Sequence, residues 1–274
     1  MSDVQRIDAA LVGRGLVRSR AQAKELLDAG RVRVDGHVEK KASTKVTTTQ
    51  SVDIEGELDR YVGRAAHKLI AALEEFPGVA ERVAGAATID VGASTGGFTQ
   101  VLLERGASRV VALDVGHGQL AEPVRSDPRV DDLEGLNIRD VVRADQLPGA
   151  PYGVVVSDLS FISLTLALPH MAPLLGDDGD MIVLVKPQFE VGRERMGRTG
   201  VVTSAEQRRE SIEKVLACAA GLDLVAHGLA WSPMVGSHGN HEYLLWLRRA
   251  EAGPGLSHEA VDDRITELTR RNDR

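Results

Sequence analysis

A glycine-rich turn between a predicted strand and a predicted helix constrains the fold of this chain more than any other feature. Residues 87–91 form a short, largely apolar run that is typical of a buried strand, and Gly92, Gly96 and Gly97 follow it at once. Such a turn lets a ligand approach the backbone closely, and the N–H groups of the next helix point toward that ligand. The pattern predicts an α/β domain with a ligand site at residues 90–98.

The sequence of the turn is compatible with two kinds of site. It lacks the dinucleotide fingerprint G-x-G-x-x-G, and no Lys follows the glycines as in a P-loop. Residues 92–96 do match G-x-S-x-G, the nucleophile elbow of serine hydrolases, with Ser94 as the nucleophile. Asp114 favours another interpretation, because an acid at the end of the next strand can accept hydrogen bonds from ribose hydroxyls. We therefore favour a nucleoside cofactor and keep a serine hydrolase as the alternative.

The rest of the body alternates short apolar runs with helical patterns. This rhythm predicts an α/β fold, a Rossmann-like parallel sheet with helices on both faces, followed by a final pair of strands. The expected strands are residues 87–91, 110–113, 154–157, 181–185, 224–229 and 243–247. Ligands of such sheets bind at the carboxyl ends of the strands.

Four charged residues are expected near those strand ends. Asp158 and Lys186 each follow an apolar strand, Glu242 precedes the last strand, and Lys68 lies on a helix before the first strand. A partly buried lysine beside a second cation can lose its proton and then accept one from a hydroxyl group. On this interpretation Lys186 is the base, Lys68 is the second cation, and the carboxylates orient both ammonium groups.

The amino-terminal segment has a charge opposite to that of the body. Residues 1–45 carry ten Lys or Arg and six Asp or Glu, whereas the whole chain has a net charge of −7. A capped helix at residues 19–30 and a hairpin turning at Asp35-Gly36 predict a compact α+β unit whose basic side chains face outward. Such a unit is suited to bind RNA phosphates. The candidate RNA-binding residues are Arg6, Arg14, Arg18, Arg20, Lys24, Arg31 and Arg33.

Cysteine content and hydropathy exclude several classes of protein. Cys218 is the only cysteine, so the chain has no intrachain disulfide and no cysteine cluster for a metal. No apolar run is long enough to cross a bilayer, and residues 1–10 do not resemble a signal peptide. We therefore expect a cytoplasmic protein with no bound metal and no membrane partner.

Several motifs resemble known families. Residues 6–8, 19–20 and 30–36 resemble the S4 RNA-binding module, and the order Lys68, Asp158, Lys186, Glu242 resembles the tetrad of FtsJ-type RNA 2′-O-methyltransferases. An S4 module before such a domain is similar to the TlyA family, also called hemolysin A, of 16S/23S rRNA cytidine 2′-O-methyltransferases. The resemblance implies S-adenosylmethionine as cofactor and ribosomal RNA or ribosomal subunits as partner. The cofactor residues that it implies are Asp90, Gly92, Ser94, Thr95, Gly96, Phe98, Asp114 and Asn137.

The expected domains are an S4-like unit at residues 1–59, a linker at 60–63 and a methyltransferase domain at 64–274. Two segments have no assigned role: the basic loop at 193–198, and the tail at 257–274, whose apolar stripe we expect to pack on the body. A non-catalytic ribosome assembly factor is a further alternative. Nothing in the sequence supports the hemolytic activity that the family's second name suggests.

Overall fold

The computed structural model describes residues 4–56, 58–192, 194–197, 199–236 and 239–270. The chain divides into two compact units, Met1–Arg60 and Tyr61–Arg274. The first unit has one apolar cluster, and the second has two, one on each face of its central sheet.

The first unit consists of two short helices and two small sheets. Its elements are β1 (Val4–Arg6), α1 (Ile7–Gly13), α2 (Arg20–Asp28), β2 (Val32–Val34), β3 (His37–Glu39), β4 (Lys45–Thr47) and β5 (Val52–Ile54). Strands β3, β2 and β5 form one antiparallel sheet, and β1 pairs with β4 in another. Residue 6 ends β1, and α1 begins at the next residue.

The predicted ends of α2 are confirmed. Ser19 Oγ accepts a hydrogen bond from Gln22 N, and Gly30 adopts a left-handed conformation just after the helix. The Gln22 side chain, however, accepts from Arg18 N, so the expected reciprocal bond to the N-cap residue itself is not formed. Asp35 and Gly36 both have positive φ angles, as a tight hairpin between β2 and β3 requires.

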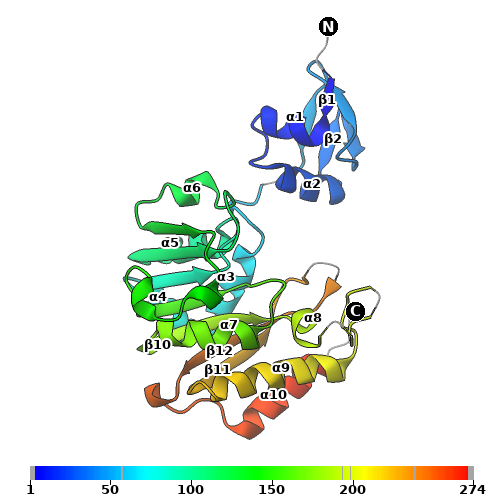
Figure 1. Ribbon diagram of the computed structural model, residues 1–274. Coiled ribbons are helices and arrows are strands. Elements are labelled where there is room, and N and C mark those ends of the chain that lie inside the picture. The colour runs from blue at the N-terminus through cyan, green and yellow to red at the C-terminus, as the bar shows by residue number, and fades with distance from the viewer. Residues whose placement is uncertain (1–3, 57, 193, 198, 237–238, 271–274) are drawn as a thin grey trace. The chain divides into compact units, whose positions relative to one another are not determined.

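The second unit is a seven-stranded sheet covered by helices on both faces (Figure 1). Its strands are β6 (Ala87–Val91), β7 (Arg109–Asp114), β8 (Val130–Glu134), β9 (Tyr152–Ser157), β10 (Leu175–Val185), β11 (Leu224–Trp231) and β12 (Tyr243–Arg249). Its helices are α3 (Ala66–Glu75), α4 (Pro77–Val83), α5 (Gly97–Glu104), α6 (Glu122–Arg125), α7 (Leu164–Met171), α8 (Pro187–Glu190), α9 (Ala205–Ala220) and α10 (His258–Arg270).

Apolar side chains alternate between the two faces of the sheet. Helices α3, α4 and α5 bury their apolar faces on one side, and α7, α9 and α10 bury theirs on the other. The tail therefore packs on the body as expected, since α10 lies along α9 (Figure 1) and Ile265 and Leu268 are buried. Residues 271–274 of that tail lie outside the described residues.

The strand order places β6 at a switch point of the sheet. The order is β11-β12-β10-β9-β6-β7-β8, with β10, β9, β6, β7 and β8 parallel and β12 antiparallel to both neighbours. From β6 the chain continues to β7 and β8 on one side, and it then crosses to β9 and β10 on the other side of β6. Such a change of direction opens a crevice at the carboxyl end of β6. The glycine-rich turn at residues 92–97 begins in this position.

Candidate active site

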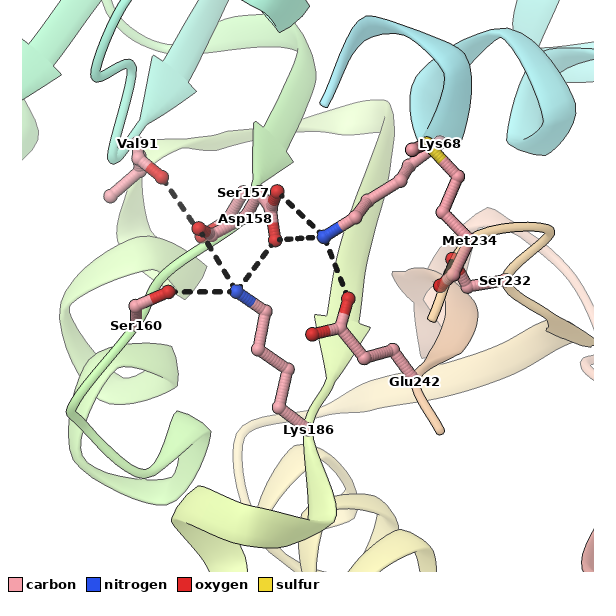
Figure 2. A network of polar contacts seen from close by, with 9 residues as sticks. All are labelled: Lys68, Val91, Ser157, Asp158, Ser160, Lys186, Ser232, Met234 and Glu242. Atoms are coloured by element: carbon pink, nitrogen blue, oxygen red, sulfur yellow. Dashed lines mark hydrogen bonds and ion pairs between the residues drawn. The ribbon is translucent and has the colours of Figure 1, made fainter. Parts of the chain in front are cut away.

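The structure brings together the four charged residues that the sequence singled out. Asp158 follows β9, Lys186 follows β10, Glu242 precedes β12, and Lys68 reaches them from α3 (Figure 2). Because β12 is antiparallel to β10, its amino end lies beside the carboxyl ends of the parallel strands. All four side chains line one cavity of about 590 Å³.

Lys68 is held by two carboxylates. Its Nζ atom lies 2.6 Å from Glu242 Oε2 and 3.1 Å from Asp158 Oδ2. Lys68 and Glu242 are 6 % and 3 % exposed, so water screens these charges little. A buried ammonium with two carboxylate partners has little freedom to rotate or leave.

Lys186 has a different set of partners. Its Nζ atom lies 2.8 Å from Asp158 Oδ1, 3.0 Å from Ser160 Oγ and 3.5 Å from the Asp158 carbonyl oxygen (Figure 2). Ser160 lines the cavity and is exposed. Lys186 thus makes one carboxylate contact, and its remaining contacts are with neutral groups.

Asp158 is the carboxylate shared by both lysines. Burial acts to raise its pKa, but the charges of Lys186 and Lys68 outweigh burial and hold the pKa of Asp158 below its ordinary value. Asp158 therefore stays ionised at neutral pH and fixes the separation of the two ammonium groups.

The loop before β12 leaves no spare room beside Glu242. A Cβ atom at Gly236 would lie 2.9 Å from Glu242 Cδ and closer still to Oε1. Gly236 N also donates a hydrogen bond to the Asn240 carbonyl, and Asn240 in turn bonds Val202 N and the Gly200 carbonyl. Sequence inspection missed Gly236, because nothing in a single glycine signals a close approach.

Asp90 lies at the carboxyl end of β6, next to the glycine-rich turn. Its Oδ2 atom accepts hydrogen bonds from Thr99 N and Thr99 Oγ1, at 3.0 and 2.7 Å. Its Oδ1 atom is buried and has no partner among the described residues. Burial raises the pKa of Asp90 to about 7, although the bonds from Thr99 oppose the shift.

The turn and the next strand are joined by backbone contacts. Asp114 Oδ2 accepts from Ser94 N at 2.8 Å and its Oδ1 accepts from Gly116 N at 2.7 Å. Gly92 and Gly96 have φ angles of +88° and +91°, which favour glycine. The Ser94 hydroxyl bonds Gln119 Oε1 and not a histidine, so the general base that a hydrolase needs does not contact it.

The other residues expected around the cofactor take varied positions. Thr95 is exposed at the tip of the turn, whereas Phe98 is 2 % exposed and packs in the apolar cluster with α3. Asn137 accepts a hydrogen bond from Arg139 N and caps a 3-10 turn at Ile138–Asp140, after β8. Phe98 thus packs beneath the turn, Thr95 is exposed, and Asn137 is half-buried.

The mouth of the cavity is aromatic and basic. Phe161 is 93 % exposed, and its ring lies 5.4 Å from that of Phe189. Arg64, also on the cavity wall, is exposed and forms no ion pair with any described residue. In the basic loop, Arg195 pairs with Glu210, and residues 193 and 198 lie outside the described residues.

The arginines predicted to bind RNA in the first unit all make contacts within that unit. Arg6 and Arg20 share Asp8, whose pKa is held well below its usual range by the hydrogen bonds of Arg6 and Arg20 in spite of burial. The remaining contacts join Arg14 to the carbonyls of Thr47 and Gln50, Arg18 to those of Asp59 and Arg60, Lys24 to Asp28, Arg31 to the Glu55 carbonyl, and Arg33 to the Glu55 carboxylate.

Two further lysines were missed in the first unit. Lys40 and Lys45 are exposed, and their ammonium groups form no ion pair or hydrogen bond within the described part of the chain. Lys40 directly follows β3, and Lys45 is the first residue of β4. Their charges are therefore fully available to a polyanion.

These parts define a class of protein. A sheet with a glycine-rich turn at its switch point and a Lys-Asp-Lys-Glu cluster at its strand ends is that of an FtsJ-like methyltransferase. Residues 61–249 match the FtsJ-like methyltransferase family, and residues 5–52 match the S4 domain family.

Individual relatives narrow the assignment. The chain is 46 % identical, over 95 % of both chains, to the 16S/23S rRNA (cytidine-2'-O)-methyltransferase TlyA of Mycobacterium tuberculosis. It is 36 % identical to Hemolysin A of Brachyspira hyodysenteriae, over 87 % of this chain and 98 % of that one. A solved structure of a candidate hemolysin from Streptococcus thermophilus covers 98 % of this chain and 95 % of its own, with 36 % identity and a TM-score of 0.76. The chain belongs to the FtsJ-like methyltransferase family, and within it to the TlyA group.

The described residues contain no helix that is both long enough and apolar enough to cross a membrane. Nor do they contain a group of three or more His, Cys, Asp and Glu side chains arranged to hold a metal ion.

Proposed function

We propose that this protein transfers a methyl group from S-adenosylmethionine to a ribose 2′-hydroxyl of ribosomal RNA. The observation that carries the proposal is that the two buried lysines have different sets of partners. Lys68 is locked between two carboxylates, whereas Lys186 has one carboxylate and the exposed Ser160 hydroxyl as partners at the cavity wall. The TlyA relative of M. tuberculosis, whose name states this reaction on cytidine, supports the same assignment.

The turn at residues 90–98 fits S-adenosylmethionine. The buried Oδ1 atom of Asp90 lacks a donor among the described residues, and an ammonium or hydroxyl of the cofactor would supply one. Each carboxylate oxygen of Asp114 accepts one backbone N–H, from Ser94 or Gly116, and has a further lone pair. With these lone pairs Asp114 would accept hydrogen bonds from ribose hydroxyls. When bound, the cofactor would supply an electrophilic methyl group, whose bond to sulfur breaks as the bond to the substrate oxygen forms, so that a neutral thioether is released.

The charged cluster then serves one proton transfer. Lys186, in its neutral form, accepts the proton that the 2′-hydroxyl loses as its oxygen forms the new bond to carbon. Asp158 orients the Nζ atom of Lys186 toward the cavity and stabilises the ammonium that results. Lys68 and Glu242 hold Asp158 in place, so that the proton acceptor and the hydroxyl meet in a fixed geometry.

Each of the two units has a surface that suits RNA. An exposed aromatic ring at the cavity mouth offers a flat surface on which a nucleobase can stack, and Phe161 has this position. The paired guanidinium groups of Arg6 and Arg20, oriented by Asp8, offer several donors to phosphate oxygens, as Lys40 and Lys45 also do. We assign ribosomal RNA as the substrate and cytidine as its target nucleoside.

Methyl transfer from labelled cofactor to separated ribosomal subunits tests the proposal. Wild type should label one or both subunits, and mapping the protected ribose identifies the nucleotide. Lys186→Ala should reduce the transfer rate by at least about a hundredfold and leave cofactor affinity unchanged, and circular dichroism should show that the variant remains folded.

Two rival functions give other results. A non-catalytic assembly factor would bind ribosomes with no transfer of label by wild type. A serine hydrolase would be labelled at Ser94 by a fluorophosphonate probe, and Ser94→Ala would lose that label. Full activity of Lys186→Ala would refute the role assigned to Lys186.

A further inference from the structure

Glu190 is a buried carboxylate that the reaction described above does not use. It ends α8, the single turn of helix that begins directly after Lys186, and it is 5 % exposed. Its Oε1 atom accepts a hydrogen bond from Leu164 N at 2.7 Å, and its Oε2 atom accepts one from Ser163 Oγ. Leu164 is the first residue of α7, and Ser163 is the N-cap residue just before it.

These contacts join the two segments that supply the reacting groups. Residues 158–163 run from the end of β9 to α7, and residues 186–190 run from the end of β10 through α8. The segments meet at three successive levels: Lys186 with Asp158 and Ser160, Phe189 with Phe161, and Glu190 with Ser163 and Leu164. Only the third level is remote from the cavity.

The middle of the first segment has little packing of its own. Ser160 is exposed, Phe161 is 93 % exposed, and Phe161 has a φ angle of +67°, which strains a bulky side chain. A segment of this kind holds its conformation only if both of its ends are fixed. Ser157 fixes one end, as a buried residue of β9, and Glu190 fixes the other.

The charge of Glu190 is well compensated. Two donors at the amino end of α7 face the carboxylate, where the helix dipole favours a negative charge. Lys214 of α9 adds an ammonium 3.6 Å from Oε2 and donates a hydrogen bond to the Glu190 carbonyl oxygen at 2.9 Å. Removing the carboxylate would leave Leu164 N buried without its acceptor and Lys214 without its counter-charge.

We propose that Glu190 is a positioning residue for methyl transfer: it anchors residues 158–163 against Lys186, and so sets where Ser160 and Phe161 stand relative to the proton acceptor. The inference rests on the proposed function. Glu190 itself makes no contact with the glycine-rich turn, and the anchored segment meets that turn only where Leu159 packs against Gly92. Glu190 should therefore affect turnover far more than cofactor binding.

Glu190→Ala, Glu190→Gln and Ser163→Ala test this role. Glu190→Ala should lower kcat for methyl transfer by at least about tenfold, since small displacements at a reacting centre have large effects on rate. Its dissociation constant for S-adenosylmethionine, measured by calorimetry, should stay within about twofold of wild type. Glu190→Gln should recover most of the rate, because an amide oxygen can still accept from Leu164 N while the Ser163 hydroxyl turns to accept from the amide NH₂.

Asp180→Asn is the matched control. Asp180 is a fully buried carboxylate in the same strand that leads to Lys186, it contacts Arg82, Arg248 and Trp246, and it takes no part in the cavity. It should lower the melting temperature without lowering kcat. If Glu190→Ala does not fold, Ser163→Ala tests the same role, because it removes one of the two hydrogen bonds to the Glu190 carboxylate. It should reduce kcat by a smaller factor than the loss of about tenfold expected for Glu190→Ala, and an unchanged kcat would contradict the role.

Three results would overturn the assignment: a kcat for Glu190→Ala within twofold of wild type, a parallel loss of cofactor affinity, or an equal loss of kcat in Asp180→Asn. Absence of methyl transfer by wild type would instead refute the proposed function, so the two failures are distinguishable.

Discussion

The ionisation of Asp90 makes the stability of the cofactor-free protein depend on pH. The unfolded chain gives up this proton near pH 3.8, and the folded chain gives it up near pH 7. Between these values the folded state holds a proton that the unfolded state has lost. The free energy of unfolding therefore falls by about 1.4 kcal/mol for each unit of rising pH.

The magnitude follows from the width of that interval. This contribution to stability is fully present below pH 3.8 and is lost by pH 7, for a total of about 4 kcal/mol. From about pH 5.5 to about pH 8 the loss amounts to about 2 kcal/mol. For a domain of this size, that corresponds to a fall of about 4–8 °C in melting temperature.

Asp90→Asn isolates the effect, because the substitution keeps the shape of the side chain and removes its ionisation. Melting temperatures of wild type and Asp90→Asn should diverge in favour of the variant as pH rises, whatever their offset at low pH. Asp177→Asn, which removes a fully exposed carboxylate, should follow wild type. Parallel curves for wild type and Asp90→Asn over this range would refute the assignment of the buried charge.

Two substitutions test the geometry of the site and the RNA surface. Gly236→Ala places a methyl group against the Glu242 carboxylate and should lower kcat by about tenfold or more. Gly197→Ala is the control, because no heavy atom lies near its Cβ position, and it should leave kcat unchanged. Equal rates for the two variants would contradict the reasoning. Replacing Lys40 and Lys45 together by Gln should weaken ribosomal RNA binding and reduce the slope of log affinity against log salt by about 1–2 units. Lys24→Gln, which removes an ammonium already paired with Asp28, should have a smaller effect on a filter-binding titration, and an unchanged slope in the double variant would exclude those lysines.

Much of the fold could be predicted because its local signals agree with its packing. The strands that became β6, β7, β9 and the second half of β10 are short β-branched runs between polar segments, and the sequence pattern located each of them. Strand β8, with the sequence Val-Asp-Asp-Leu-Glu, escaped prediction because an edge strand that is only half-buried needs no strong apolar pattern. The first half of β10 also escaped, because its glycines and aspartates are typical of a turn.

The residues of the site could be predicted where a charged residue stands at an unusual place in the sequence. A lysine directly after four apolar strand residues draws attention, and so does an acid before a glycine-rich turn. Ser160, Glu190 and Gly236 are ordinary residues whose roles depend on contacts between segments far apart in the chain. The free charges of the first unit could not be identified either, since pairing of Arg6 and Arg20 with Asp8 is a property of the folded chain.

The contact between α3 and the glycine-rich turn has a mechanical consequence. A Cβ atom at Gly97 would lie 3.0 Å from Ala66 N and 3.1 Å from the Gly63 carbonyl oxygen, and one at Gly63 would collide with Thr95. At Gly97, main chain therefore packs directly on the main chain of residues 63–66, with no side chain between them. The distance between the glycine-rich turn and the start of α3, the helix that carries Lys68, is therefore set at this contact by the backbone and does not depend on side-chain rotamers.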